Sequence, residues 1–88
     1  MTKSVFTDEY RLFRKMLTEA RESAGLTQTQ LAKALRQPQS FVSKYENGER
    51  RLDVIEFLQI ADCLRFDAHA FLDRLQSFKK KNQSESIE

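Results

Sequence analysis

Residues 27–48 constrain the fold most, because their pattern predicts two short helices joined by a tight turn. Thr27, followed three residues later by Gln30, forms a capping-box signature at the start of the first helix. Pro38 suits the first position of a new helix, where its missing N–H costs nothing. An Asn-Gly pair then provides a stop signal. We therefore expect the second helix over residues 38–46.

Apolar residues at fixed offsets would hold these two helices across one another, as in a helix-turn-helix. The inward positions are occupied by Leu31, Leu35, Val42 and Tyr45, with the small Ala32 at the crossing. The opposite face of the second helix carries Gln39, Ser40, Ser43 and Lys44. The segment thus predicts a packed helix pair whose second member keeps a polar face free.

Three further helices are predicted around this pair, because apolar residues recur at helical spacing. The expected inner stripes are Tyr10, Phe13, Leu17, Ala20 and Ala24 before the pair, then Val54, Phe57, Leu58, Ala61 and Leu64, and finally Phe71, Leu72, Leu75 and Phe78. Good helix formers dominate the 88 residues, with only two Gly and one Pro. We predict an all-α, compact five-helix bundle over residues 8–78, preceded by a leader (1–7) and followed by a disordered tail (79–88).

Composition argues against several classes of protein. Cys63 is the single cysteine, which excludes an internal disulfide and favours a buried thiol in a reducing compartment. His69 is the single histidine and lacks partners at metal-ligand spacing. The sequence has no Gly-rich phosphate loop, paired catalytic carboxylates or nucleophile–base pair, so we expect no catalytic residue, metal, cofactor or enzymatic activity.

No apolar run approaches the length of a membrane span, about 20 residues, and the N-terminus lacks the apolar region of a secretory signal. We therefore expect a cytoplasmic protein without membrane contact. The overall net charge is +2 but is unevenly placed. Five basic and two acidic residues give +3 over residues 28–51, whereas residues 52–78 carry −3. Such a polarised charge steers a polyanion toward one face.

Residues 24–32 and 39–51 resemble the Xre/Cro-type, phage-repressor-like helix-turn-helix family, and the resemblance extends from about Phe13 to Leu72. It implies a five-helix bundle that binds operator DNA as a homodimer. The resemblance places Gln39 and Ser40 at base edges and Gln28 and Asn47 at backbone phosphates. A Gln amide indeed offers the donor and acceptor that match adenine N6 and N7. Further DNA contacts are expected from Phe41, Ser43, Lys44, Arg50 and Arg51.

The chain departs from the family pattern at three places. Arg36-Gln37 stands in the turn where the family usually has Gly and an apolar residue. Either a non-Gly residue takes a positive φ there and carries strain, or the turn uses another geometry. Pro38 replaces the usual capping hydroxyl. Phe41 is large where the family is often small, and either meets a thymine methyl or packs on Tyr45; the second role is favoured.

The sequence therefore predicts a DNA-binding transcriptional regulator, a dimeric repressor on a palindromic operator. Some of the last helix's apolar residues would form the two-fold contact. Two alternatives stay open: an antitoxin-like module that binds a toxin or other protein partner, and a restriction–modification controller protein.

Overall fold

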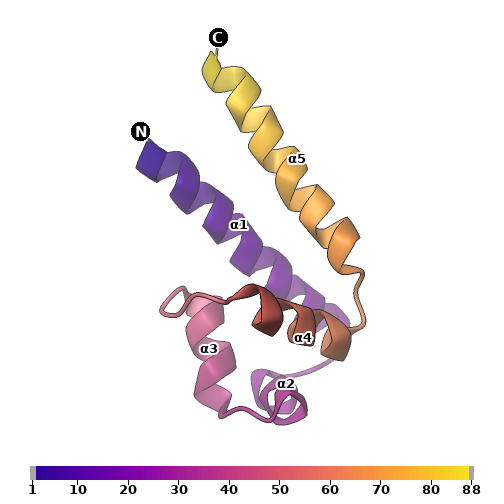
Figure 1. The fold of residues 1–88 in the computed structure, drawn as a ribbon. Coiled ribbons are helices and arrows are strands. Elements are labelled where there is room, and N and C mark those ends of the chain that lie inside the picture. The colour runs from indigo at the N-terminus through magenta and orange to yellow at the C-terminus, as the bar shows by residue number, and fades with distance from the viewer. Residues whose placement is uncertain (1, 88) are drawn as a thin grey trace.

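The computed structural model describes the backbone of residues 2–87 and the side chains of residues 8–78, and this part of the chain forms five α-helices (Figure 1). The helices are α1 (Thr2–Ser23), α2 (Gln28–Leu35), α3 (Gln39–Asn47), α4 (Val54–Leu64) and α5 (Ala68–Ile87). The predicted all-α, five-helix architecture is thereby confirmed.

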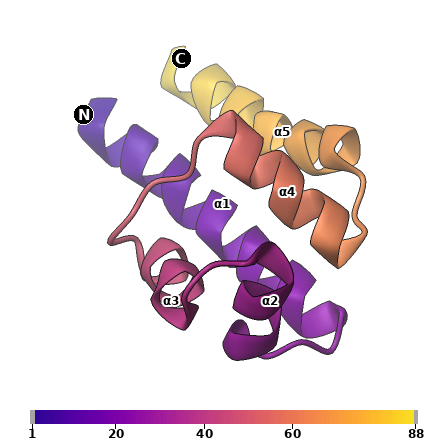
Figure 2. The same cartoon turned by 60° about the horizontal axis from the view of Figure 1, so that its bottom comes forward.

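The two terminal helices, α1 and α5, lie side by side and antiparallel, as both ribbon views show (Figures 1 and 2). The α2–α3 pair lies at the opposite end of the molecule from the two chain termini (Figure 1). Its two helices make the most extensive contact between elements, α3 also packs on α1, and α2 packs on α4. The predicted helix pair is thus held from both sides by the rest of the bundle.

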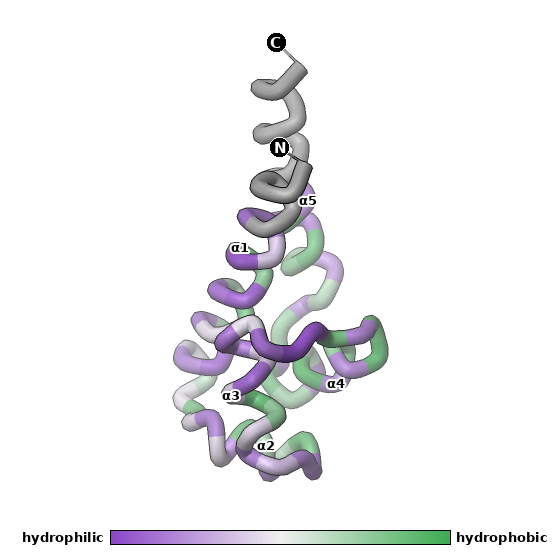
Figure 3. Tube along the Cα trace, turned by 90° about the vertical axis from the view of Figure 1, so that its left-hand side faces the viewer, coloured by the Kyte–Doolittle hydropathy of each residue, from purple (hydrophilic) through white to green (hydrophobic). Residues whose placement is uncertain are grey.

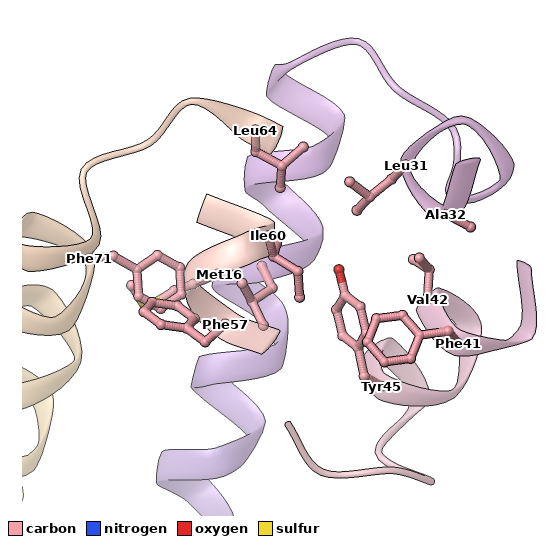
Figure 4. Packing of buried hydrophobic residues seen from close by; sticks show 11 residues of the cluster. Met16, Leu31, Ala32, Phe41, Val42, Tyr45, Phe57, Ile60, Leu64 and Phe71 are labelled. Atoms are coloured by element: carbon pink, nitrogen blue, oxygen red, sulfur yellow. The ribbon is translucent and has the colours of Figure 1, made fainter. Parts of the chain in front are cut away.

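The core joins the helix pair to the other helices through one hydrophobic cluster (Figure 4). The largest fully buried side chains come from four helices: Leu17, Leu31, Val42, Tyr45 and Ile60. Aromatic side chains extend the cluster toward α5, where the ring centroids of Phe57 and Phe71 are 5.2 Å apart. Fully burying a side chain of this size contributes about 1.5–3 kcal/mol, so the cluster is the main restraint on α3.

The capping box predicted at Thr27 is present, and a second one forms at Asp53. The Thr27 hydroxyl oxygen accepts from the Gln30 N–H at 3.1 Å, and the Asp53 carboxylate accepts from the Glu56 N–H at 2.8 Å. In each case the third helical residue also accepts from the cap's own backbone N–H. These reciprocal bonds satisfy donors that would otherwise lack partners at the start of α2 and α4.

The turn between α2 and α3 takes the first of the two geometries considered for it, with a positive φ at a non-Gly residue. Arg36 has φ +60°, and the Gln37 N–H donates to the Ala32 carbonyl at 2.9 Å. Gly25 and Gly48 follow α1 and α3 at φ +75° and +85°. After each glycine, the next backbone N–H donates to the carbonyl five residues earlier, as Gln37 does. Arg36 therefore takes the left-handed conformation that glycine usually takes at a helix end. For a residue with a Cβ this conformation costs about 1–2 kcal/mol.

Several sequence-based positions need correction. Pro38 is the residue before α3 rather than its first residue; its backbone is extended, and no side-chain bond caps the helix. On α4, Val54 and Leu58 were predicted to point inward but are 71% and 44% exposed, whereas Ile60 is fully buried in the hydrophobic core. The cause is that α4 is apolar nearly all round, which leaves its rotation undetermined by periodicity.

The terminal helices also differ from the prediction at other positions. Ala24 is exposed and Met16 is buried on α1, while Leu72 of α5 is exposed. The backbone of α1 begins at Thr2 and that of α5 continues to Ile87, so both helices extend into the segments predicted as leader and tail. The side chains of those segments lie outside the described residues, and the division at residues 7 and 78 stays a prediction.

Candidate nucleic-acid interface

The outer face of α3 is the candidate interface. Val42 and Tyr45 are fully buried and fix the rotation of the helix about its axis. The opposite side of α3 then carries the exposed side chains of Gln39, Ser40, Lys44 and Asn47. Ser43 is half-buried, and its hydroxyl donates to the Ser40 carbonyl at 3.3 Å. Four of the five predicted polar residues on α3 therefore stand free in solvent on one face.

Phe41 takes the second of the two roles considered for it. Its side chain is 8% exposed, and its ring meets that of Tyr45 edge-on with centroids 5.5 Å apart (Figure 4). The ring therefore belongs to the core rather than to the exposed face. Its large side chain widens the packed surface of α3 beside the polar one.

A buried carboxylate ties α3 to the two preceding helices. Glu46 sits in the last turn of α3, and its side chain is only 5% exposed. Arg21 of α1 donates to it twice, from Nε at 2.8 Å and from Nη2 at 3.1 Å. The third Arg21 nitrogen donates to the Leu26 carbonyl at 2.8 Å. This fork-shaped pairing is the strong form of an Arg–carboxylate contact, and the hydrogen bond to Glu46 raises the pKa of Arg21.

The same carboxylate reaches the exposed face of α3 through two amides. Gln28 at the start of α2 donates from Nε2 to Glu46 Oε1 at 2.9 Å. Gln39 at the start of α3 donates from Nε2 to Gln28 Oε1 at 3.1 Å. A continuous chain of hydrogen bonds therefore runs from Arg21 in α1 to the Gln39 amide on the surface. The sequence predicts roles for both glutamines but not this connection between them.

The loop between α3 and α4 presents its two arginines in different ways, and Figure 3 shows it as a hydrophilic stretch. Arg50 lies over the Phe41 ring, with Cζ 4.7 Å from the centroid, and forms an ion pair with Glu56 of α4. Arg51 lies over the Tyr10 ring of α1, with Cζ 4.6 Å from its centroid. Cation–π contacts of this kind contribute about 0.5–1 kcal/mol at exposed sites, so they bias where both guanidinium groups lie.

A shallow recess of about 420 Å³ lies beside α3 and brings several predicted contacts together. Its lining comprises Gln37, Pro38, Ser40, Phe41, Lys44, Glu49 and Arg50. Gln39 is exposed on the outer face of α3, and its hydrogen bond to Gln28 brings the start of α2 to that face. Three residues that shape the interface were missed by sequence reasoning: Arg21, Glu46 and Glu56. The signal for Glu46 was an acidic residue in the last turn of a helix whose one other charged residue is Lys44.

Other kinds of site find no support in the part of the chain that the structure describes. Among residues 8–78, no three His, Cys, Asp or Glu side chains are grouped as metal ligands. No helix within the described residues is both long and apolar enough to cross a membrane. Cys63 is a half-buried free thiol on α4.

Two helices that cross over a tight turn, with a packed inner face and a free polar outer face on the second, define a helix-turn-helix domain. The helix-turn-helix family model matches residues 17–70. A protein from Pseudomonas syringae pv. tomato str. DC3000, described as an XRE-family like protein, has a similar solved structure, with a TM-score of 0.82 and 47% sequence identity. That match covers 86% of this chain and 93% of the other.

A curated relative gives the same assignment. YqaF of Bacillus subtilis (strain 168), described as an uncharacterized HTH-type transcriptional regulator, is 32% identical over 75 residues. The match covers 85% of this chain and 99% of YqaF. The chain belongs to the XRE-type helix-turn-helix family, as predicted, and these matches support a DNA-binding transcriptional regulator.

Proposed function

We propose that this protein is a sequence-specific repressor that binds double-stranded operator DNA with α3 in the major groove. The observation that carries the proposal is the Gln39 amide, which is exposed and held at 3.1 Å by Gln28. That bond uses one of the two amide hydrogens of Gln39. The other hydrogen and the amide oxygen stay available for a base. These remaining groups match adenine N7 and N6 in the major groove, and their fixed placement lowers the entropy cost of reading a base.

The neighbouring residues have complementary proposed roles. Ser40 contacts a second base edge, since a hydroxyl both donates and accepts. Ser43 and Lys44 extend the contact along the same face of α3. Phe41 supports that face from beneath because its ring is buried against Tyr45.

The remaining predicted contacts, except Arg50, are assigned to the DNA backbone. The side-chain amide of Gln28 is occupied by Glu46 and Gln39, so the phosphate meets the first turn of α2, whose backbone N–H groups lack intrahelical acceptors. Asn47 and the two loop arginines, Arg50 and Arg51, flank the reading face from the other end of α3. A domain that occupies an operator in this way excludes other proteins from the same groove, which is the basis for proposing repression.

The test is selection of bound sequences from a random duplex library, followed by binding measurements on the enriched duplex. Gln39→Ala should weaken binding to that duplex by about 1–3 kcal/mol and relax preference at one base pair. Gln76→Ala removes a matching amide from the exposed surface of α5 and should change neither. Unchanged base preference in Gln39→Ala would show that this residue does not read DNA.

The phosphate assignment has its own readout. Arg51→Ala should weaken all sequences about equally and reduce the slope of log K against log salt by roughly one. Arg74→Ala changes the net charge equally from an exposed position on α5, and its slope should match the wild type.

We also propose that the repressor is a homodimer on a palindrome with half-sites about 34 Å apart. Of the predicted two-fold contacts, Phe71 is buried and unavailable, whereas Leu72 is 42% exposed. Val54, Ile55 and Leu58 expose further apolar surface on α4. Sedimentation of Leu72→Glu and Ile55→Glu distinguishes the two helices, since a charge within the contact dissociates the dimer. A wild-type protein that stays monomeric at high micromolar concentration would exclude this arrangement.

A further inference from the structure

Arg50 is restrained more tightly than a phosphate-binding side chain needs to be. Its Nη1 and Nη2 atoms donate to the two carboxylate oxygens of Glu56, at 3.0 and 2.8 Å. Nη1 also donates to the Arg51 carbonyl at 2.8 Å, and the guanidinium Cζ lies over the Phe41 ring, 4.7 Å from its centroid. The charge of Arg50 is therefore compensated inside the protein before any DNA arrives.

Glu56 is itself fixed by the start of α4. Its Oε1 accepts from the Asp53 N–H at 3.0 Å, and its own N–H donates to the Asp53 carboxylate at 2.8 Å. The hydrogen bond from Arg50 lowers the pKa of Glu56, so the carboxylate is ionised at neutral pH. Holding Arg50 thus costs little additional ordering of Glu56, because the capping box has already immobilised it.

The restrained arginine lies on the same side of the molecule as the reading helix. Arg50 lines the recess of about 420 Å³ together with Ser40 and Lys44, two of the proposed DNA contacts. The Arg50 side chain is 40% exposed, against 20% for Glu56. A phosphate approaching this wall would meet a guanidinium whose hydrogen-bonding fork is already turned toward a carboxylate.

We propose that Glu56 is a positioning residue: its ion pair with Arg50 prevents Arg50 from binding a DNA phosphate and holds it packed against Phe41 beside the reading helix. The inference rests on the proposed function and refines it: Arg50 lies at the interface but does not bind a phosphate as a full cation. Its consequence is specificity, because each suppressed phosphate contact lowers affinity for all sequences while base contacts are kept. Removing the Glu56 charge should release Arg50 to bind a phosphate.

The experiment measures binding to a random-sequence duplex as a function of salt concentration. Glu56→Gln keeps an amide oxygen for the Asp53 N–H, removes the charge and replaces the second acceptor oxygen with an NH2 group that cannot accept from Arg50. Its slope of log K against log salt should be steeper than that of the wild type by about 0.9, the value for one extra phosphate contact on B-DNA. Glu49→Gln is the matched control, because it removes the same charge from an exposed residue of the same loop and recess. Its slope should stay within error of the wild type.

A double-mutant cycle with Arg50→Ala separates this mechanism from a general charge effect. In the Arg50→Ala background, Glu56→Gln should leave the slope unchanged, since the cation that it would release is absent. Equal slopes for Glu56→Gln and Glu49→Gln, or a steeper slope that persists without Arg50, would overturn the inference while leaving DNA binding intact. A wild-type protein that binds neither random nor selected duplex would instead overturn the proposed function, and the inference with it. Circular dichroism checks that each variant is folded.

Discussion

Replacing Arg21 with methionine should destabilise the protein far more than the loss of an ordinary surface charge. The side chains of Arg21 and Glu46 are 12% and 5% exposed, so the pair is largely withdrawn from water. Methionine fills much of the arginine volume but leaves the Glu46 carboxylate buried with the Gln28 amide as its remaining side-chain donor in the described structure. Breaking a buried ion pair in this one-sided way costs about 3–5 kcal/mol.

This loss is large for a domain of this size. Unfolding free energies scale at about 0.05–0.15 kcal/mol per residue, which gives roughly 4–13 kcal/mol for a chain of 88 residues. One kcal/mol shifts the melting temperature of a small domain by about 4–8 °C, so the expected fall in Tm is at least about 12 °C. Urea denaturation followed by circular dichroism gives the free energy directly.

Two further variants identify the cause. Arg11 pairs with Asp8 at 3.6 Å on the exposed side of the same helix, and Arg11→Met should cost no more than about 1 kcal/mol. The double variant Arg21→Met/Glu46→Leu removes both charges and should recover most of the lost stability. It should not recover the base preference assigned to Gln39, because the hydrogen-bond chain through Gln28 begins at Glu46.

Two outcomes would contradict this role of the Arg21–Glu46 pair. If Arg21→Met costs about the same as Arg11→Met, the pair behaves as an exposed one and does not anchor α3. If the double variant is as unstable as the single one, the uncompensated carboxylate is not what destabilises the protein. In either case the buried network would lose its role in positioning the reading face.

Two other substitutions test the strain and packing of the helix pair. The buried Tyr45 hydroxyl has no hydrogen-bond partner among the described residues and points into the core toward Ile60 (Figure 4). Tyr45→Phe should therefore raise the unfolding free energy by about 1 kcal/mol. A loss of stability in urea denaturation would instead reveal a partner for the hydroxyl. Arg36→Gly removes a Cβ penalty of about 1–2 kcal/mol at φ +60° and adds an entropy cost of about 0.5–1, so thermal unfolding should show a net gain of about 0.5–1 kcal/mol. Unchanged or lower stability in Arg36→Gly would mean that its side chain contributes to the turn.

Local signals in the sequence predicted the helix-turn-helix framework because they act within a few residues of one another. The capping box that starts at Thr27 spans only three positions, and it forms as expected. The glycine end of α3 was also predicted, since glycine is the residue that takes a positive φ most easily. Arg65 ends α4 at φ +62° without any such signal. The ring of Phe66, the next residue, stacks on Phe71 of α5, a contact that no local signal shows.

The rotation of α4 was less predictable for a different reason. Its apolar residues occupy every side of the helix, so several stripes fit the sequence equally well. Burial of Ile60 is decided by contacts with Leu31, Tyr45 and the rest of the core, which lie far away along the chain. The exposed Val54 and Ile55 are the consequence of that choice.

The net charge counted from the sequence does not show which charged side chains are already paired in the structure. The +3 of residues 28–51 counts Glu46 and Arg50 as free charges, but each is paired with a residue outside that segment. Arg21 compensates Glu46 and Glu56 compensates Arg50, so the two corrections cancel and the total stays +3 while its members change. A net charge therefore predicts that a polyanion is attracted, but not which cations meet it. The salt dependence of DNA binding should accordingly show no full phosphate contact from Arg50, because its guanidinium is already paired with Glu56.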